Sequence, residues 1–188
     1  MNTDSAKTDA EVVSLVLSNK DFFVILISRY EEKLTRYMIR LGVSVQEDRE
    51  DILQSVFIKV YKNLNNYDDS FSFSSWIYRI AHNEAMSFFR ARSIRPYGHT
   101  IANSEDVFLY IADALDLADE VNKSYDRREI EKALNALDEK YKDIIVLRFF
   151  EELDYKEISD ILEIPPGSVA TLLHRAKKQL HTLLEHIQ

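Results

Sequence analysis

The chain contains no cysteine and only three glycines and three prolines among its 188 residues. The absence of cysteine excludes a disulfide framework, a thiolate metal site and a cysteine nucleophile. So few helix-breaking residues, together with apolar residues that recur at a spacing of 3.6, favour an almost entirely helical protein. No pair of segments shows the alternation expected of paired strands.

Long hydrophobic runs are also missing. No apolar stretch approaches the roughly 18 residues needed to span a membrane. The N-terminal residues MNTDSAKTDAEVV are polar and acidic, whereas a signal peptide has a basic start followed by an apolar stretch. We therefore expect no membrane insertion and a cytoplasmic location.

Motifs for catalysis and metal binding are not found either. There is no Gly-x-x-x-x-Gly-Lys phosphate loop and no Gly-x-Gly pattern. His174, His181 and His186 are spaced by seven and five residues, which is not a metal-ligand pattern. We expect the five histidines to be surface residues, and the chain to have no catalytic residues, no metal ion and no cofactor.

The net charge of −8 is unfavourable for binding nucleic acid, but the acidic residues are unevenly distributed. Residues 100–126 carry seven acidic side chains and one basic side chain, whereas residues 1–99 carry 13 of each. Two small basic patches remain, one of four arginines within residues 79–95 and one of Arg175, Lys177 and Lys178. Because DNA affinity increases with the number of phosphates neutralised, we expect weak binding by the chain alone and a larger DNA-binding partner.

Apolar periodicity and capping signals predict an all-α fold of two small helical domains joined by an acidic linker. The N-terminal domain, residues 1–98, has expected helices over 9–17, from about 21 to a cap at Gly42, over 46–64 and over 74–92. Pro96 and Gly98 close it. The linker covers residues 99–125. The C-terminal domain, residues 126–188, has expected helices over 127–137, 140–150, 155–162 and 166–187.

Residues 153–179 have the pattern of a DNA-binding helix-turn-helix. Asp154 and Glu157 are spaced as a capping box for the first helix, and Pro166 suits the first turn of the second. Only about three residues separate the two helices. An ordinary helical hairpin with solvated lysines is the alternative interpretation. The polar face of the second helix carries Ser168, Thr171, Arg175 and Lys178.

Two separated segments together resemble the extracytoplasmic-function sigma factors of bacterial RNA polymerase. Residues 47–93, which begin EDREDILQSVF, resemble the second conserved region of that family, and residues 136–180 resemble the fourth. The resemblance implies that the chain binds core RNA polymerase and directs promoter-specific initiation by recognising and melting promoter DNA. It also implies a possible anti-sigma factor as a further partner.

The resemblance implies a polymerase-docking site at Asp51, Gln54 and Phe57. In the family, a stretch of the kind Asp-x-x-Gln-x-x-Phe binds the clamp coiled coil of the largest polymerase subunit. One carboxylate and one amide beside an aromatic ring can bind a basic coiled coil with modest buried area. Ser55 departs from the family, which usually has Glu at this position.

The resemblance also places contacts to the minus-ten promoter element in the loop at residues 65–70 and in the helix that follows. The loop receives a base flipped out of the duplex, which needs stacking and polar contacts to offset the loss of base stacking. Trp76, Ile77 and Ile80 recur at helical spacing and are interpreted as core. The expected minus-ten residues are Asn65, Asn66, Tyr67, Arg79, Asn83, Arg90 and Arg92.

In the family, the second helix of the helix-turn-helix reads the minus-thirty-five element. Ala170 and Leu172 stand where the family usually has basic residues, so two possible contacts are lost. Glu163 stands where the turn often has Gly, which costs stability if the turn needs a positive φ. The expected minus-thirty-five residues are Ser168, Thr171, His174, Arg175 and Lys178.

Two other functional classes fit parts of the sequence. One is a helix-turn-helix transcriptional regulator with a helical sensor domain, which binds duplex DNA without polymerase. The other is a protein-interaction module that retains a non-functional helix-turn-helix. The N-terminal domain distinguishes them, because a sensor needs a ligand pocket whereas a sigma factor needs a polymerase-docking face beside exposed aromatic residues.

Overall fold

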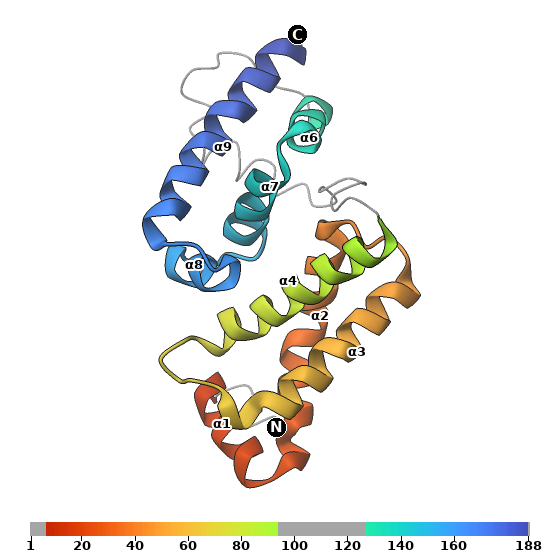
Figure 1. The fold of residues 1–188 in the computed structure, drawn as a ribbon, viewed down its shortest axis with the longest axis vertical. Coiled ribbons are helices and arrows are strands. Elements are labelled where there is room, and N and C mark those ends of the chain that lie inside the picture. Colours follow the sequence, from red (N-terminus) through yellow and green to blue (C-terminus); the bar gives the residue numbers. More distant parts are fainter. Residues whose placement is uncertain (1–6, 94–126, 188) are drawn as a thin grey trace.

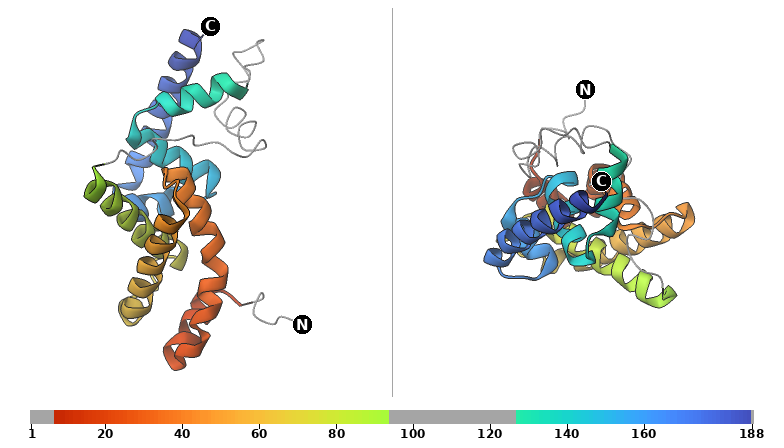
Figure 2. Two further views of the ribbon diagram at one scale, coloured as in Figure 1. Left: turned by 90° about the vertical axis from the view of Figure 1, so that its right-hand side faces the viewer. Right: turned by 90° about the horizontal axis from the view of Figure 1, so that it is seen from above.

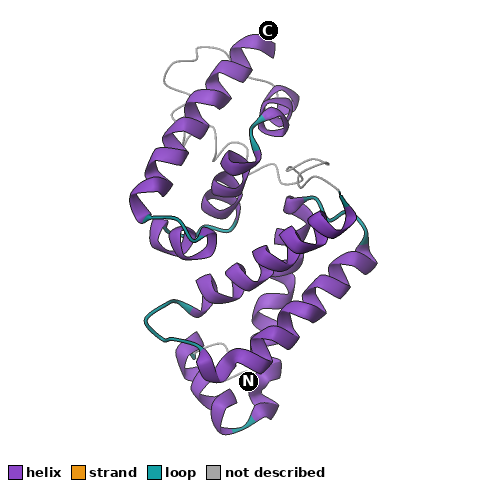
Figure 3. Ribbon diagram, in the orientation of Figure 1, coloured by secondary structure: helices purple, strands orange, loops and turns teal. Residues whose placement is uncertain are grey.

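The computed structural model describes residues 7–93 and 127–187. Within these two ranges every regular element is helical and no strand occurs (Figures 1 and 3). The predicted all-α class and the division into two helical domains are confirmed. The expected linker at residues 99–125, with Pro96 and Gly98 before it, lies outside the described residues.

The N-terminal domain consists of helices that begin and end within a few residues of the predicted ones. They are α1 (Asp9–Ser18), η2 (Lys20–Phe22), α2 (Phe23–Leu41), α3 (Gln46–Asn63), η3 (Leu64–Asn66) and α4 (Phe73–Arg92). Gly42 ends α2 with a φ of 104°, as expected for a left-handed C-terminal cap. Ser72 begins α4, because its side chain accepts a hydrogen bond from the Ser75 amide at 3.0 Å.

The core of this domain lies between α2, α3 and α4. Leu34 and Tyr37 from α2, Val56 from α3 and Ile77 from α4 are all fully buried. Trp76 and Ile80 are only partly buried and pack against the edge of this core. The prediction that Trp76, Ile77 and Ile80 are core residues is therefore confirmed for Ile77, and only in part for Trp76 and Ile80.

His82 is a correction to the expectation that all histidines lie at the surface. It is 9% exposed, because α4 turns it toward α2. There its Nδ1 lies 2.8 Å from the hydroxyl oxygen of Tyr37. Burial lowers the pKa of His82, which keeps the ring neutral, while the charge of Asp143 opposes this shift.

The C-terminal domain contains α6 (Arg127–Ala136), α7 (Glu139–Ile145), η4 (Val146–Phe150), α8 (Tyr155–Leu162) and α9 (Pro166–Ile187). Leu134, Ile144 and Leu180 are fully buried at its centre. The helix predicted over 140–150 changes character at Val146, where η4 is a π-helical turn. The Glu151 amide donates to the Val146 carbonyl at 3.1 Å, the wider spacing of this turn, and the helical segment ends at Phe150 as predicted.

Helices α8 and α9 form the expected helix-turn-helix. The capping box is confirmed: the Glu157 amide donates to Asp154 Oδ1 at 2.8 Å, and the Asp154 amide donates to Glu157 Oε2 at 3.0 Å. Glu163 has a φ of 54°, so the turn does need the conformation that favours glycine. Ser159 braces the turn, since its hydroxyl donates to the Ile164 carbonyl at 2.6 Å.

The two domains touch through α4 and α8, which lie side by side (Figures 1 and 2). The segment between η4 and α8 reaches α2 as well. There Arg40 of α2 forms an ion pair with Glu151.

Candidate polymerase and nucleic-acid interfaces

The predicted docking residues lie together on one side of α3. Asp51 and Gln54 are exposed, and Phe57 is half-buried. The Phe57 ring packs edge-to-face against Phe23, with centroids 6.5 Å apart and planes at 83°. Phe57 is therefore part of the domain's packing and part of its accessible surface at the same time.

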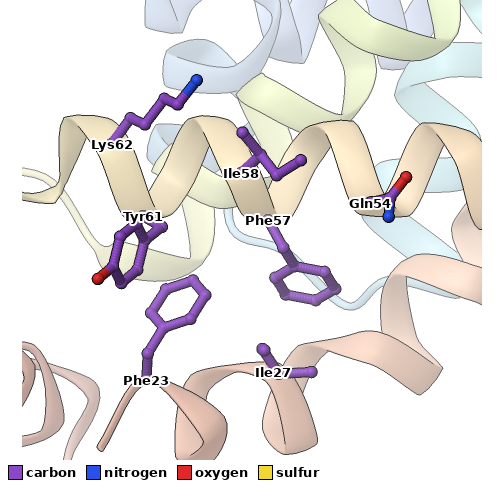
Figure 4. Close-up of a pocket in the computed structure, with 7 residues that line it drawn as sticks. All are labelled: Phe23, Ile27, Gln54, Phe57, Ile58, Tyr61 and Lys62. Atoms are coloured by element: carbon purple, nitrogen blue, oxygen red, sulfur yellow. The ribbon is translucent and has the colours of Figure 1, made fainter. Parts of the chain in front are cut away.

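An apolar groove of about 620 Å³ runs beside these residues. Figure 4 shows Phe57 and Tyr61 pointing from α3 toward Phe23 and Ile27. Ile58 and Tyr61 are 46% and 42% exposed, so together they give the groove accessible apolar surface. The groove is lined by Phe23, Ile27, Gln54, Phe57, Ile58, Tyr61 and Lys62.

Ile58, Tyr61 and the α2 side of this groove were not among the docking residues predicted from the sequence. A signal for the α3 side was present, because residues 54, 57, 58 and 61 follow the spacing i, i+3, i+4, i+7 of a single helix face. Two apolar residues on that face remain open to solvent. Lysines stand at the rim, with Lys20 Nζ 5.4 Å from the centroid of the Tyr61 ring.

The loop between α3 and α4 presents polar residues next to an aromatic cluster. Asn65 and Asn66 are exposed. The Tyr67 ring lies 5.7 Å from Phe73 and 5.2 Å from Trp76, centroid to centroid. The Tyr67 hydroxyl donates to the Phe71 carbonyl at 2.5 Å, so it braces the loop. Burial raises the pKa of this hydroxyl.

The residues predicted on α4 differ in their exposure and in the contacts that their side chains already make within the chain. Asn83 is exposed, and Arg90 is exposed while donating to the Ser87 hydroxyl at 3.1 Å. The guanidinium of Arg79 lies 5.9 Å from the Phe71 ring centroid. Arg92 is paired, with its Nη1 2.7 Å from an Asp48 oxygen. A contact from Arg92 to a phosphate therefore competes with this ion pair.

The residues predicted on α9 share one side of the helix. Thr171, His174, Arg175 and Lys178 are exposed, and Ser168 is half-buried. The Thr171 hydroxyl donates to the Gly167 carbonyl at 3.0 Å, so its own proton is used within the helix. Its lone pairs and the three larger side chains remain directed at solvent.

The two departures from the family pattern on α9 have different surroundings. Ala170 is exposed on the same side as the polar residues. Leu172 is half-buried and packs against the core of its own domain. An apolar residue at 172 therefore contributes to folding, whereas Ala170 leaves an open position on the polar face.

Residues 7–93 and 127–187 contain no group of three His, Asp or Glu side chains placed to hold a metal ion. No helix in these ranges is long and apolar enough to cross a membrane.

Comparison with known proteins gives the family. The model described as Sigma-70 region 2 matches residues 26–95, and the model described as Sigma-70, region 4 matches residues 127–180. The chain is 32% identical to the ECF RNA polymerase sigma factor SigW of Bacillus subtilis, over 90% of this chain and 92% of that protein. It is 31% identical to the ECF RNA polymerase sigma-E factor of Haemophilus influenzae, over 95% and 96%.

Two solved structures share the fold. One is CnrH in complex with the cytosolic domain of CnrY, with a TM-score of 0.68 and 21% identity over 97% of this chain and all of that chain. The other is the sigma factor RpoE of Bartonella quintana in complex with the anti-sigma factor NepR, with a TM-score of 0.58 and 20% identity over 87% and 96%.

The two matched regions, in this order, define a sigma factor of the sigma-70 class. The chain belongs to the extracytoplasmic-function group of that family. It is a subunit that binds core RNA polymerase and directs promoter-specific transcription, and the prediction from the sequence is confirmed. The sensor-type regulator is not favoured, because region 2 occupies residues 26–95, where a sensor domain would lie.

Proposed function

We propose that α3 docks on core RNA polymerase through Asp51, Gln54 and the apolar groove beside Phe57. The observation that carries this proposal is the juxtaposition of two exposed polar side chains with an open groove whose wall includes Ile58 and Tyr61. A partner helix would gain apolar burial in the groove and orientation from the polar pair. Stable interfaces have this composition, with an apolar centre and a polar rim.

Promoter melting is assigned to the loop after α3 and to the open side of α4. Asn65 and Asn66 would contact the edges of a flipped base, beside the ring cluster formed by Tyr67 and Trp76. Stacking on an aromatic side chain contributes about 1 to 3 kcal/mol per base. Arg79, Asn83, Arg90 and Arg92 would hold the backbone of the separated strand.

Reading of the minus-thirty-five element is assigned to α9. Arg175 is the first candidate for a contact to guanine or to the backbone, because it is exposed in the middle of the polar face. Ser168, Thr171, His174 and Lys178 flank it. With Ala170 in place of a basic residue, this half would bind promoter DNA weakly or prefer a different sequence.

The remaining proposals concern the chain as a whole. Both solved structures described above are complexes, and one of them contains a protein called an anti-sigma factor. We infer that this sigma factor also has an anti-sigma partner. We further propose a cytoplasmic location, no catalytic activity of its own, and domain boundaries at residues 1–98, 99–125 and 126–188.

The docking proposal is tested by replacing Gln54 with Ala and measuring affinity for core polymerase. Gln54 is exposed, so Gln54→Ala should leave folding unchanged while weakening polymerase binding. Gln46→Ala is the matched control, because it makes the same change at an exposed position of the same helix. Equal affinity of the two variants would remove Gln54 from the interface.

Phe57→Ala should weaken binding further, since it removes a wall of the groove. Because Phe57 also packs on Phe23, its helix content and unfolding transition need to be measured alongside the affinity. A folded Phe57→Ala variant that binds polymerase as well as the unchanged chain would overturn the assignment of the groove.

A further inference from the structure

Helix α1 carries none of the residues assigned so far to polymerase or DNA contacts. It spans Asp9–Ser18 and precedes residues 26–95, which match the region 2 model. Val12 and Val16 bury its apolar face in the N-terminal domain. The helix also contacts η3, which begins the loop between α3 and α4 (Figure 1). This contact places α1 beside the loop that is proposed to receive a flipped base.

Asp9, the first residue of α1, uses both of its carboxylate oxygens on α2. Oδ1 accepts a hydrogen bond from Arg29 Nη1 at 2.8 Å, and Oδ2 accepts one from the Tyr30 hydroxyl. Arg29 Nη2 also donates to the Lys7 carbonyl at 2.8 Å, so the ion pair is fixed to the backbone before α1 as well. Tyr30 is only 3% exposed, and burial raises the pKa of its hydroxyl, to which Asp9 adds. The hydroxyl therefore keeps its proton and donates to Asp9.

The Tyr30 ring connects Asp9 with the aromatic cluster beside the loop. It packs edge-to-face on Phe73, the first residue of α4, with centroids 5.4 Å apart and planes at 68°. Phe73 is 3% exposed, and its ring centroid lies 5.7 Å from those of both Tyr67 and Trp76. Because a charge-assisted hydrogen bond fixes the Tyr30 ring, it also limits where Phe73 can lie. We call Asp9, Tyr30 and Phe73 the loop brace.

The charge of Asp9 also acts on the loop itself. Burial raises the pKa of the Tyr67 hydroxyl, and the charges of Asp69 and Asp9 raise it further. This hydroxyl therefore keeps the proton that it donates to the Phe71 carbonyl at 2.5 Å. Asp9 thus supports the hydrogen bond that closes the loop, in addition to the packing behind it.

A pocket for a flipped base works best when its rings are already in place. Ordering side chains during binding costs part of the energy that stacking provides, and unstacking the base has a cost of its own. Tyr67 and Trp76 are half-buried, so part of each ring stays open to a base. The loop brace holds the side of the cluster that faces the domain.

We propose that Asp9 and Tyr30 are positioning residues for promoter melting, which fix the aromatic cluster through Phe73 before DNA binds. The effect on melting rests on the proposed function of the loop, whereas the loop brace within the free chain does not. Neither residue lines the groove on α3. A chain without the loop brace should therefore bind core polymerase as before and open promoters more slowly.

The loop brace is tested in the free chain by the fluorescence of Trp76. Because Trp76 is the only tryptophan, its quenching by acrylamide reports on the cluster without a label. Asp9→Ala should increase quenching and shift the emission to the red, since the Tyr30 ring is no longer fixed. Asp21→Ala is the matched control, as it removes an exposed carboxylate from the first turn of η2. Equal quenching in these two variants, both shown to be folded, would overturn the loop brace.

Tyr30→Phe is the milder variant, because it removes the hydroxyl and keeps the ring. It should also increase the quenching of Trp76, and unchanged quenching would contradict the brace even if Asp9→Ala fails to fold. With core polymerase, it should open a duplex promoter about tenfold more slowly, since a hydrogen bond to a charged group is lost. Tyr141→Phe, which removes a hydroxyl from a buried residue of the other domain, should open it at the unchanged rate.

A template whose minus-ten element is already unpaired separates positioning from a general loss of stability. There the unstacking cost is removed, so Tyr30→Phe should approach the rate of the unchanged chain. Opening of duplex DNA at the unchanged rate, or the same loss on both templates, would overturn the proposal. If Tyr67→Ala also opens duplex promoters at the unchanged rate, the proposed function of the loop fails, whereas the quenching of Trp76 still decides whether the brace exists.

Discussion

Ile58 offers the sharpest test of the groove on α3. Its side chain is 46% exposed, so about half of its apolar surface is available to a partner. Burying a whole isoleucine side chain contributes about 1.5 to 3 kcal/mol. Ile58→Ala should therefore weaken binding to core polymerase by about 1 kcal/mol, which is about fivefold in Kd. Folding should be little affected, because the lost surface already faces water and alanine favours helix.

The matched control is Ile39→Ala, the same change at a residue of α2 that is 40% exposed and lies outside the groove. Affinities of the two variants for core polymerase can be compared by titration against a labelled chain, after both have been shown to unfold at similar denaturant concentrations. The reasoning is refuted if Ile58→Ala binds like the unchanged chain, or if Ile39→Ala loses as much affinity.

Two further predictions concern DNA binding and pH. Ala170→Arg should add one phosphate contact on α9 and steepen the slope of log K for DNA binding against log salt concentration by about 0.9. The control is Ala136→Arg, which adds the same charge at an exposed residue of α6 and should leave the slope unchanged. Equal slopes in the two variants would count against the proposed DNA-binding face of α9. Burial lowers the pKa of His82 in the folded chain, so the unfolded chain binds more protons near pH 6.5. The stability that a neutral His82 contributes is therefore present above pH 6.5, the pKa of an ordinary histidine. It is lost as the pH falls from there through the lower pKa of the folded chain. His82→Asn, which keeps an acceptor for the Tyr37 hydroxyl, should flatten this dependence in denaturant titrations between pH 5 and 7.5, whereas the exposed His174→Asn should not; an unchanged slope in His82→Asn would show that another group is responsible.

The helices could be predicted from the sequence because their signals are local. Apolar spacing located the cores of α2 and α3, and single residues such as Gly42 and Asp154 marked where helices end and begin. The π-helical turn over Val146–Phe150 could not be predicted, since its residues continue the apolar pattern of an ordinary helix.

The candidate sites could be predicted as motifs but not as surfaces. The spacing of Asp51, Gln54 and Phe57 gave one face of α3, whereas the other wall of the groove comes from α2, whose position relative to α3 is a property of the fold. His82 was expected at the surface because nothing in its neighbourhood signals a buried partner 45 residues away. The roles of the DNA-facing residues stay predictions.

The contact between the two domains could not be predicted from the sequence. Arg40 and Glu151 are 111 positions apart, and each looks like a solvated helix residue when read with its neighbours. Only the docking of α8 on α4 brings them together and removes them from water. Ion pairs across a domain contact depend on the tertiary arrangement, and the spacing of apolar residues along the sequence gives no information on it.

The central claim is that this chain binds core RNA polymerase and directs it to specific promoters. The most direct measurement adds the purified chain to core polymerase and a library of promoter fragments, and sequences those that are opened. The account predicts that the chain binds core polymerase and that the opened fragments share two elements, while the chain alone binds duplex DNA weakly. Tight binding of the chain to DNA without polymerase, with no association between the two proteins, would contradict it.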